Sequence, residues 1–253
     1  MENNRNKPSS VFIISLIVTI LVAAWGILSP QTMGNSASAA FHWLTLNFSW
    51  FYLAIMFAFI AFVLALAFSK YGAVRLGADD SKPEHSTLSW FAMLFSAGMG
   101  VGLVFWGAAE PLTHFLGPNP IYGLTPGSPE AGEFALFASF MHWGLHPWAA
   151  YAVVALPMAY MQFRKNKPAL VSSALIPLIG DEGAKGPIGK LVDILAIFAT
   201  VAGIGTSLGL GAMQINSGLN YLFDVPQNDF TILIIIVVAT VLYVGTALIG
   251  IDK

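Results

Sequence analysis

The sequence contains no cysteine, and only 9% of its 253 residues are charged. The absence of thiols excludes disulfides, thiolate metal sites and thiol catalysis within these residues. A soluble domain usually carries about a quarter charged residues, so the scarcity of charge excludes an ordinary soluble fold. The formal net charge of −2 provides no basic surface, and no nucleic-acid partner is expected. The sequence also lacks a phosphate-cradling loop in context, a nucleophile with a base, and paired carboxylates. We therefore expect neither an enzyme nor an organic cofactor.

Hydrophobic residues, by contrast, make up 57% of the chain, and they gather in nearly continuous runs of about 20 residues. The strands of a membrane β-barrel alternate in segments of about 10 residues, so these runs indicate α-helices. We expect an all-α polytopic protein with about six transmembrane helices, forming one membrane-embedded domain over residues 1–253 in the lipid bilayer. The expected spans are residues 11–28, 50–68, 88–109, 134–163, 191–215 and 230–251.

The basic residues predict the orientation of these spans. If the spans alternate in direction, every Lys and Arg falls on the same side of the membrane. The positive-inside rule makes that side cytoplasmic, so we expect both ends of this six-span segment to face the cytoplasm. The basic residues are Arg5, Lys7, Lys70, Arg75, Lys82, Arg164, Lys165, Lys167, Lys185, Lys190 and Lys253.

The third expected span contains three glycines within five residues, at Gly98, Gly100 and Gly102. Each glycine inside a helix costs about 1 kcal/mol relative to alanine, so we expect the helix to be interrupted here. In a membrane, backbone that leaves a helix must face protein or a water-filled cavity. An interrupted apolar span therefore indicates a binding site near the middle of the bilayer.

The fourth expected span carries an aromatic cluster. On one continuous helix, with Trp143 at 0°, Tyr151 falls at about 80°, Gly144 at about 100° and Trp148 at about 140°. Gly144 would leave an empty notch among these rings, suited to a quaternary ammonium, which has no N–H to donate and binds to π-faces. Ordinary aromatic packing or an interfacial belt is the alternative. A belt, however, lies at the ends of spans, and this cluster begins well inside.

The distribution of charged and hydroxyl groups narrows the chemical class of the ligand further. Residues 91–109 and 134–163 contain no Asp, Glu, Lys or Arg, so a buried cation would lack a counter-charge. A zwitterion needs none, because exposed N–H groups near Gly98–Gly102 could receive its carboxylate. Unwound carbonyls around Ser96 and Met99, with hydroxyls such as that of Thr200, could bind sodium; close helix packing through small residues is the alternative. We expect Asp193 to form a helix cap or a polar contact at the start of the fifth expected span.

Three stretches resemble the betaine/choline/carnitine transporter family (BCCT) over essentially the whole chain, most closely its bacterial sodium-coupled glycine betaine transporters. They are SAGMGVGLVFWGAAEPL, MHWGLHPWAAYAVVALPMAY and ILAIFATVAGIGTSLGLGAMQI. The resemblance implies two leading helices followed by two inverted five-helix repeats of the LeuT type. Family members continue through a second repeat, so we expect this chain to be the N-terminal part of such a transporter.

The resemblance also implies roles for individual residues. In the family, positions matching Trp143, Trp148 and Tyr151 contribute to a box around the trimethylammonium group. Positions matching Gly98, Met99, Gly100 and Gly102 form the unwound segment near the substrate, and choline-carrying relatives have aspartate in place of Gly102. Positions matching Ser96 and Met99 give backbone oxygens to one sodium, and the position matching Thr200 gives a hydroxyl to another. Some members have a second hydroxyl where this chain has Ile204, so the second sodium site departs from that pattern.

The expected function is secondary active uptake of glycine betaine or a related trimethylammonium zwitterion for osmoprotection, coupled to sodium. Two alternatives stay open: sodium-independent exchange of carnitine-like substrates, and a non-transporting membrane subunit built from half the fold. The resemblance implies a bacterial inner membrane and a homotrimer.

Overall fold

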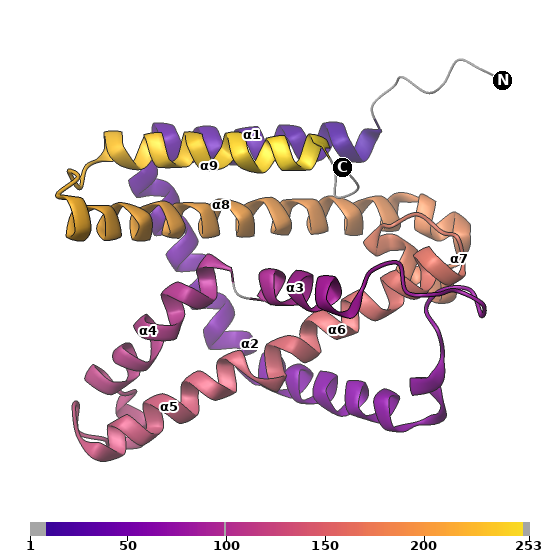
Figure 1. Ribbon diagram of the computed structural model, residues 1–253, viewed down its shortest axis with the longest axis horizontal. Coiled ribbons are helices and arrows are strands. Elements are labelled where there is room, and N and C mark those ends of the chain that lie inside the picture. Colours follow the sequence, from indigo (N-terminus) through magenta and orange to yellow (C-terminus); the bar gives the residue numbers. More distant parts are fainter. Residues whose placement is uncertain (1–8, 99, 250–253) are drawn as a thin grey trace. The chain divides into compact units, whose positions relative to one another are not determined.

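The computed structural model describes residues 9–98 and 100–249, and the described residues form helices and no strand (Figure 1). They divide into two compact units. One comprises the residues up to 82 together with 140–201, and the other comprises 83–139 and the residues from 202 onward. The longer helices are α1 (Ser10–Leu28), α2 (Pro30–Phe68), α3 (Thr87–Gly98), α4 (Val101–Leu116), α5 (Pro129–Trp143), α6 (Leu145–Ala159), α7 (Ile176–Lys185), α8 (Pro187–Phe223) and α9 (Asp229–Ile249). The short ones are η1 (Lys70–Ala73), η2 (Pro120–Tyr122), η3 (Tyr160–Arg164) and η4 (Val171–Leu175).

Four of the described helices, α1, α2, α8 and α9, are long and apolar enough to cross a membrane without interruption. They correspond to four of the six expected spans. The other two expected spans, residues 88–109 and 134–163, are interrupted and form the pairs α3–α4 and α5–α6. Many large apolar side chains lie exposed on these helices, for example Leu28 at 83% and Phe68 at 88%. Such surfaces are suited to lipid, and the chain is a multi-pass membrane protein.

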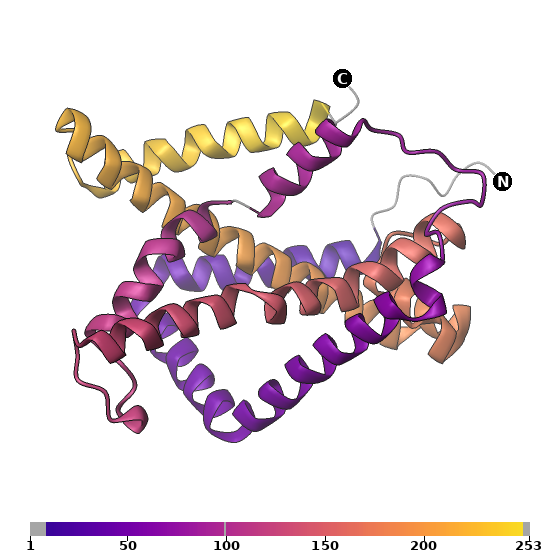
Figure 2. The ribbon, with the colours of Figure 1, turned by 60° about the horizontal axis from the view of Figure 1, so that its bottom comes forward.

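The helix that contains the second expected span, 50–68, is longer than that span, because α2 begins at Pro30 and runs for 39 residues. Proline at the first position of a helix has its φ angle already set for helix and loses no backbone hydrogen bond. The corner before it is held by Trp25, whose Nε1–H donates to the Thr32 hydroxyl at 2.9 Å. Figures 1 and 2 show that α2 is bent. The Thr45 hydroxyl bonds back to the carbonyl of Phe41 at 3.0 Å, a contact that often bends helices.

Within the first unit, α2 packs along α6, and α6 and α7 pack against η4. Two loops also meet there. The Arg164 guanidinium, at the end of η3, donates to the carboxylate of Asp79 at 2.8 Å and to the carbonyl of Gly77 at 2.9 Å. These residues belong to the loops after the second and fourth expected spans, so the two loops lie on the same side of this unit.

In the second unit, the segment after α4 folds back onto α5. The Gly127 N–H donates to the Phe115 carbonyl at 2.9 Å, and the rings of Tyr122 and Phe134 lie 4.5 Å apart. Apart from Phe134, α5 packs through small side chains. The buried residues there are Ala131, Ala135 and Ala138.

Candidate functional site

The break in the third span lies where the glycines predicted it. Helix α3 ends at Gly98, and α4 begins at Val101 after Gly100, whose φ of −71° and ψ of 176° are extended. Figure 1 shows that α3 and α4 are not collinear. The Gly100 carbonyl accepts the N–H of Leu103 at 3.0 Å and so starts the new helix. The prediction of an interrupted helix is confirmed.

The break exposes both N–H donors and C=O acceptors of the backbone. The first N–H groups of α4 have no partner within their own helix, and neither do the last carbonyls of α3. A Cβ added at Gly100 or at Gly102 would meet no described atom within 4 Å, so a ligand has room to approach this backbone. Ser96 lies in the last turn of α3, so its carbonyl is among these terminal groups. Met99, expected to contribute to both the substrate and the sodium sites, lies outside the described residues.

The fourth span is interrupted as well, which the sequence analysis did not predict. Helix α5 ends at Trp143, and α6 begins at Leu145 after Gly144, whose φ is −87° and ψ is −131°. The assumption of one continuous helix is therefore wrong, and the angles assigned to Trp143 relative to the other aromatics do not hold. A sequence signal for the break was present: Pro147 fits the first turn of a helix and kinks or breaks an interior, although α6 itself contains Pro157.

Gly144 does not leave an empty notch. A Cβ at this position would clash with the backbone carbonyl oxygen of Phe140. The glycine is needed because the chain passes too close to the preceding turn for any side chain. Its role in this structure is to permit the break between α5 and α6.

The structure brings two of the predicted aromatic residues together. The rings of Trp148 and Tyr151, on one face of α6, have centroids 5.8 Å apart and an interplanar angle of 45°. Both side chains are more than half exposed, at 55% and 69% respectively, so their π-faces are accessible. Trp143 lies beyond the break, at the end of α5, and is 37% exposed. The glycine run belongs to the other unit.

Thr200 lies on α8, where its hydroxyl donates to the carbonyl of Ala196 at 2.8 Å. It faces a cavity of about 230 Å³, which is also lined by Met158, Leu170, Asp193 and Ile197. The hydroxyl oxygen retains lone pairs for a cation, because its hydrogen is used in the bond to the helix. Ser96 and Thr200, each expected to bind a sodium ion, belong to different units.

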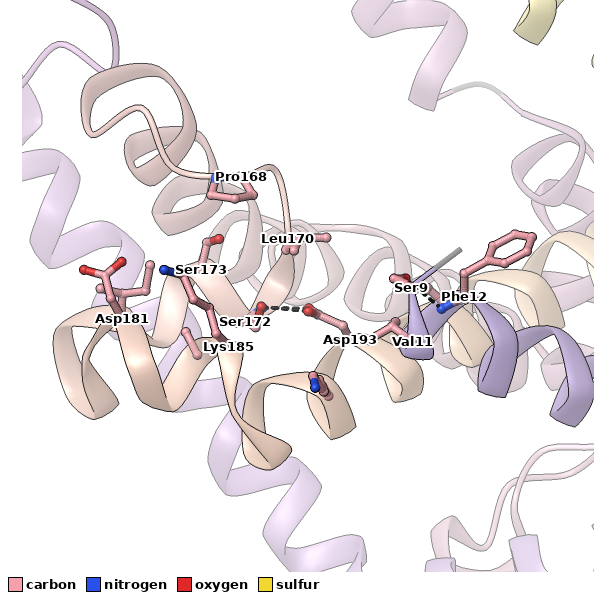
Figure 3. A pocket seen from close by; sticks show the side chains of 14 residues that line it. Ser9, Val11, Phe12, Pro168, Leu170, Ser172, Ser173, Asp181, Lys185 and Asp193 are labelled. Carbon is pink, nitrogen blue, oxygen red and sulfur yellow. Dashed lines mark hydrogen bonds between the residues drawn. The ribbon is translucent and has the colours of Figure 1, made fainter. Parts of the chain in front are cut away.

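Asp193 makes the polar contact expected at the start of the fifth span. Its side chain is buried, and its two carboxylate oxygens accept from the N–H of Ser172 at 2.9 Å and from the hydroxyl of the same serine at 2.7 Å (Figure 3). This bond joins η4 to α8. The sequence could not identify the partner, because the two residues lie 21 positions apart and no sequence pattern pairs them.

These features define the class as a helical multi-pass membrane protein in which two expected spans are interrupted at glycine. One interruption leaves backbone groups exposed. The other lies next to a pair of aromatic rings. Comparison of sequences then identifies the family. The chain belongs to the betaine/carnitine/choline family of transporters (BCCT), whose sequence model matches residues 10–253.

Individual relatives support this membership. The chain is 51% identical over 245 residues to the glycine betaine transporter OpuD of Bacillus subtilis (strain 168), covering 97% of this chain and 47% of OpuD. It is 47% identical to a probable glycine betaine transporter of Desulfitobacterium hafniense (strain Y51), covering 98% of this chain and 49% of that one. It is 41% identical to an ectoine/hydroxyectoine transporter of Virgibacillus pantothenticus, covering 100% and 49%. The chain spans about half the length of these curated relatives.

Proposed function

We propose that this chain forms part of a secondary active transporter that takes up glycine betaine or a related trimethylammonium zwitterion for osmoprotection. The observation that carries the proposal is the break in the third span, which exposes backbone N–H and C=O groups within an apolar helix pair of a BCCT family member. Two of the similar proteins carry glycine betaine in their names. The ectoine transporter among the relatives supports the wider class of zwitterionic solutes.

The substrate site in this proposal has two parts. Trp143, Trp148 and Tyr151 contribute rings to the trimethylammonium group, a contact worth about 2 kcal/mol when it is desolvated. The backbone of the Gly98–Gly102 segment, Met99 included, receives the carboxylate at the start of α4, where the helix dipole favours negative charge. Neither region supplies an acidic side chain, which favours a zwitterion over a simple cation.

Sodium is the proposed coupling ion. Backbone oxygens of Ser96 and Met99 would bind one sodium, and the Thr200 hydroxyl would bind another. Sodium binding would stabilise the outward-open state and increase its affinity for substrate. The helices around the break would then rock to expose the site to the cytoplasm.

The remaining parts of the proposal concern the surroundings of the protein. Residues 1–253 would form one membrane-embedded domain in a bacterial inner membrane, with a cytoplasmic N-terminus, in a homotrimer. The contact of Arg164 with Asp79 supports the orientation, because both loops then belong to the basic side. The test is a single cysteine in place of Ser81, in the full-length protein without other cysteines. An impermeant thiol reagent should label it in inverted vesicles and not in whole cells, and the opposite pattern would refute the orientation.

The function is tested by uptake of radiolabelled glycine betaine in cells that lack their own betaine transporters. The full-length protein should accumulate betaine when sodium is present outside and fail to do so when sodium is replaced by N-methylglucamine. The Trp148→Ala variant should lose affinity by about thirtyfold, the equivalent of a 2 kcal/mol contact. Trp50→Ala, which removes an exposed indole from α2, is the matched control and should leave uptake unchanged. Unchanged affinity in the Trp148 variant would remove this residue from the site.

A further inference from the structure

Among the described residues, the buried carboxylate of Asp193 forms no ion pair, although Lys185 and Lys190 line the same cavity. Its side chain is 6% exposed, and its hydrogen bonds with described residues come from the neutral donors of Ser172. The described ion pairs Arg164–Asp79 and Lys167–Asp181 do not include it. An ionised group inside a membrane helix is costly unless it is paired, and it usually marks an ion pathway.

Two cavities of the first unit meet at this carboxylate. The smaller one, of about 230 Å³, also reaches Thr200. The larger one, of about 390 Å³, extends past Ser172 and Ser173 toward α7 and the start of α1, as Figure 3 shows. Both cavities are lined by Leu170, Asp193 and Ile197, so both reach Asp193.

Helix geometry places Asp193 and Thr200 on the same face of α8. They are seven residues apart, which is about two helical turns or about 10 Å along the axis. Asp193 is also the only charged side chain in α8 after Lys190. The Ser172 hydroxyl bonds to its carboxylate, and the buried Ser173 lines the larger cavity. Hard cations prefer oxygen ligands of this kind.

We propose that Asp193 binds a monovalent alkali cation at the junction of the two cavities. The bond from Ser172 holds the carboxylate in place, and the remaining lone pairs are available to the ion. The identity of the cation as the coupling sodium rests on the proposed function. In that case sodium moves from Thr200 along one face of α8 as it leaves the protein, and it binds at Asp193 on the way.

The test compares sodium dependence in isosteric variants of the full-length protein. Asp193→Asn removes the charge, but its amide can still accept the Ser172 N–H and donate to the hydroxyl. In proteoliposomes, this variant should raise the half-saturating sodium concentration for betaine uptake at least about tenfold, because the attraction of the charge is lost. It should keep its maximal uptake at saturating sodium. Asp181→Asn, which removes another carboxylate of the larger cavity, should behave like the wild type.

Two further variants separate ion binding from a structural role. Ser172→Ala removes one of the two bonds that hold the carboxylate and keeps its charge, so it should raise the half-saturating sodium concentration by less than Asp193→Asn does. Lys190→Gln removes the nearest basic residue on α8 and should leave the sodium dependence at the wild-type value. The proposal is overturned if Asp193→Asn leaves the sodium dependence unchanged. It is also overturned if Ser172→Ala or Lys190→Gln causes an equal loss, since the carboxylate would then serve only as a cap or as the partner of Lys190.

A second measurement does not depend on transport. The melting temperature of the purified full-length protein should rise when sodium replaces N-methylglucamine, and Asp193→Asn should reduce that rise while Asp181→Asn does not. If the wild type takes up no betaine or needs no sodium, the proposed function fails, and the melting experiment still decides on Asp193. No difference between the Asp193 variant and the wild type in this experiment would refute the cation site.

Discussion

The break at Gly144 makes a quantitative prediction for Gly144→Ala. The added Cβ would clash with the carbonyl oxygen of Phe140, and that carbonyl is backbone, which no rotation of a side chain can move. Accommodating extra atoms in a packed structure costs about 1–3 kcal/mol. Alanine also favours continuous helix over glycine by about 1 kcal/mol, so the variant is driven toward joining α5 to α6. We expect a lower melting temperature, and uptake of betaine reduced at least about tenfold as Trp143 shifts relative to Trp148.

Helix α5 itself provides the matched control. A Cβ at Gly132 would meet only the Phe115 ring, at an ordinary distance of 3.7 Å. Gly132→Ala should therefore be neutral, or should stabilise the protein by up to about 1 kcal/mol. Melting of the purified full-length protein and betaine uptake in proteoliposomes measure the two effects. If Gly144→Ala matches Gly132→Ala in both assays, the close approach to Phe140 does not maintain the break.

Two other predictions concern charge. Gly102→Asp introduces a counter-charge into open space at the start of α4, so choline uptake should appear and betaine uptake should fall; continued absence of choline uptake in a well-expressed variant would contradict the counter-charge argument. Asp79→Asn removes the ion pair with Arg164, so trypsin should cleave the folded protein faster after Arg75, whereas Asp80→Asn should not change the rate. Because Arg164 lowers the pKa of Asp79 below its ordinary value of 3.8, the stabilisation is present above that pH and is lost as the pH falls through the lowered pKa. Equal cleavage of both variants at neutral pH would rule out a role for the pair in holding the loop.

Long apolar runs and the placement of basic residues are properties of whole segments and do not depend on contacts between particular residues. For this reason the class and most of the helices could be predicted from the sequence. It predicted the break at Gly98–Gly102 from glycine density alone. That rule is incomplete, since Gly203, Gly205 and Gly209 lie within seven residues and remain within α8. The difference is set by neighbouring structure, which a single sequence does not contain.

Two features of the site depend on the folded geometry and were missed for that reason. Glycine is required at Gly144 because the chain there passes close to the Phe140 carbonyl, a contact that exists only once the chain has turned. The partner of Asp193 is a serine in a separate short helix, η4. The aromatic cluster was predicted by residue type, but its geometry was wrong, because the helical angles assumed an unbroken helix through Trp143 and Trp148.

The length of α2 has a consequence for how the protein sits in its membrane. At 1.5 Å per residue its 39 residues extend for about 58 Å, while the hydrocarbon layer is about 30 Å thick. Only the apolar second half suits that layer. The first half carries amides and hydroxyls, among them Gln31, whose side chain donates to Asn35 at 3.2 Å. A thicker bilayer would bring these polar groups into its hydrocarbon layer. The polar half of α2 therefore limits how deeply this helix can insert into the membrane.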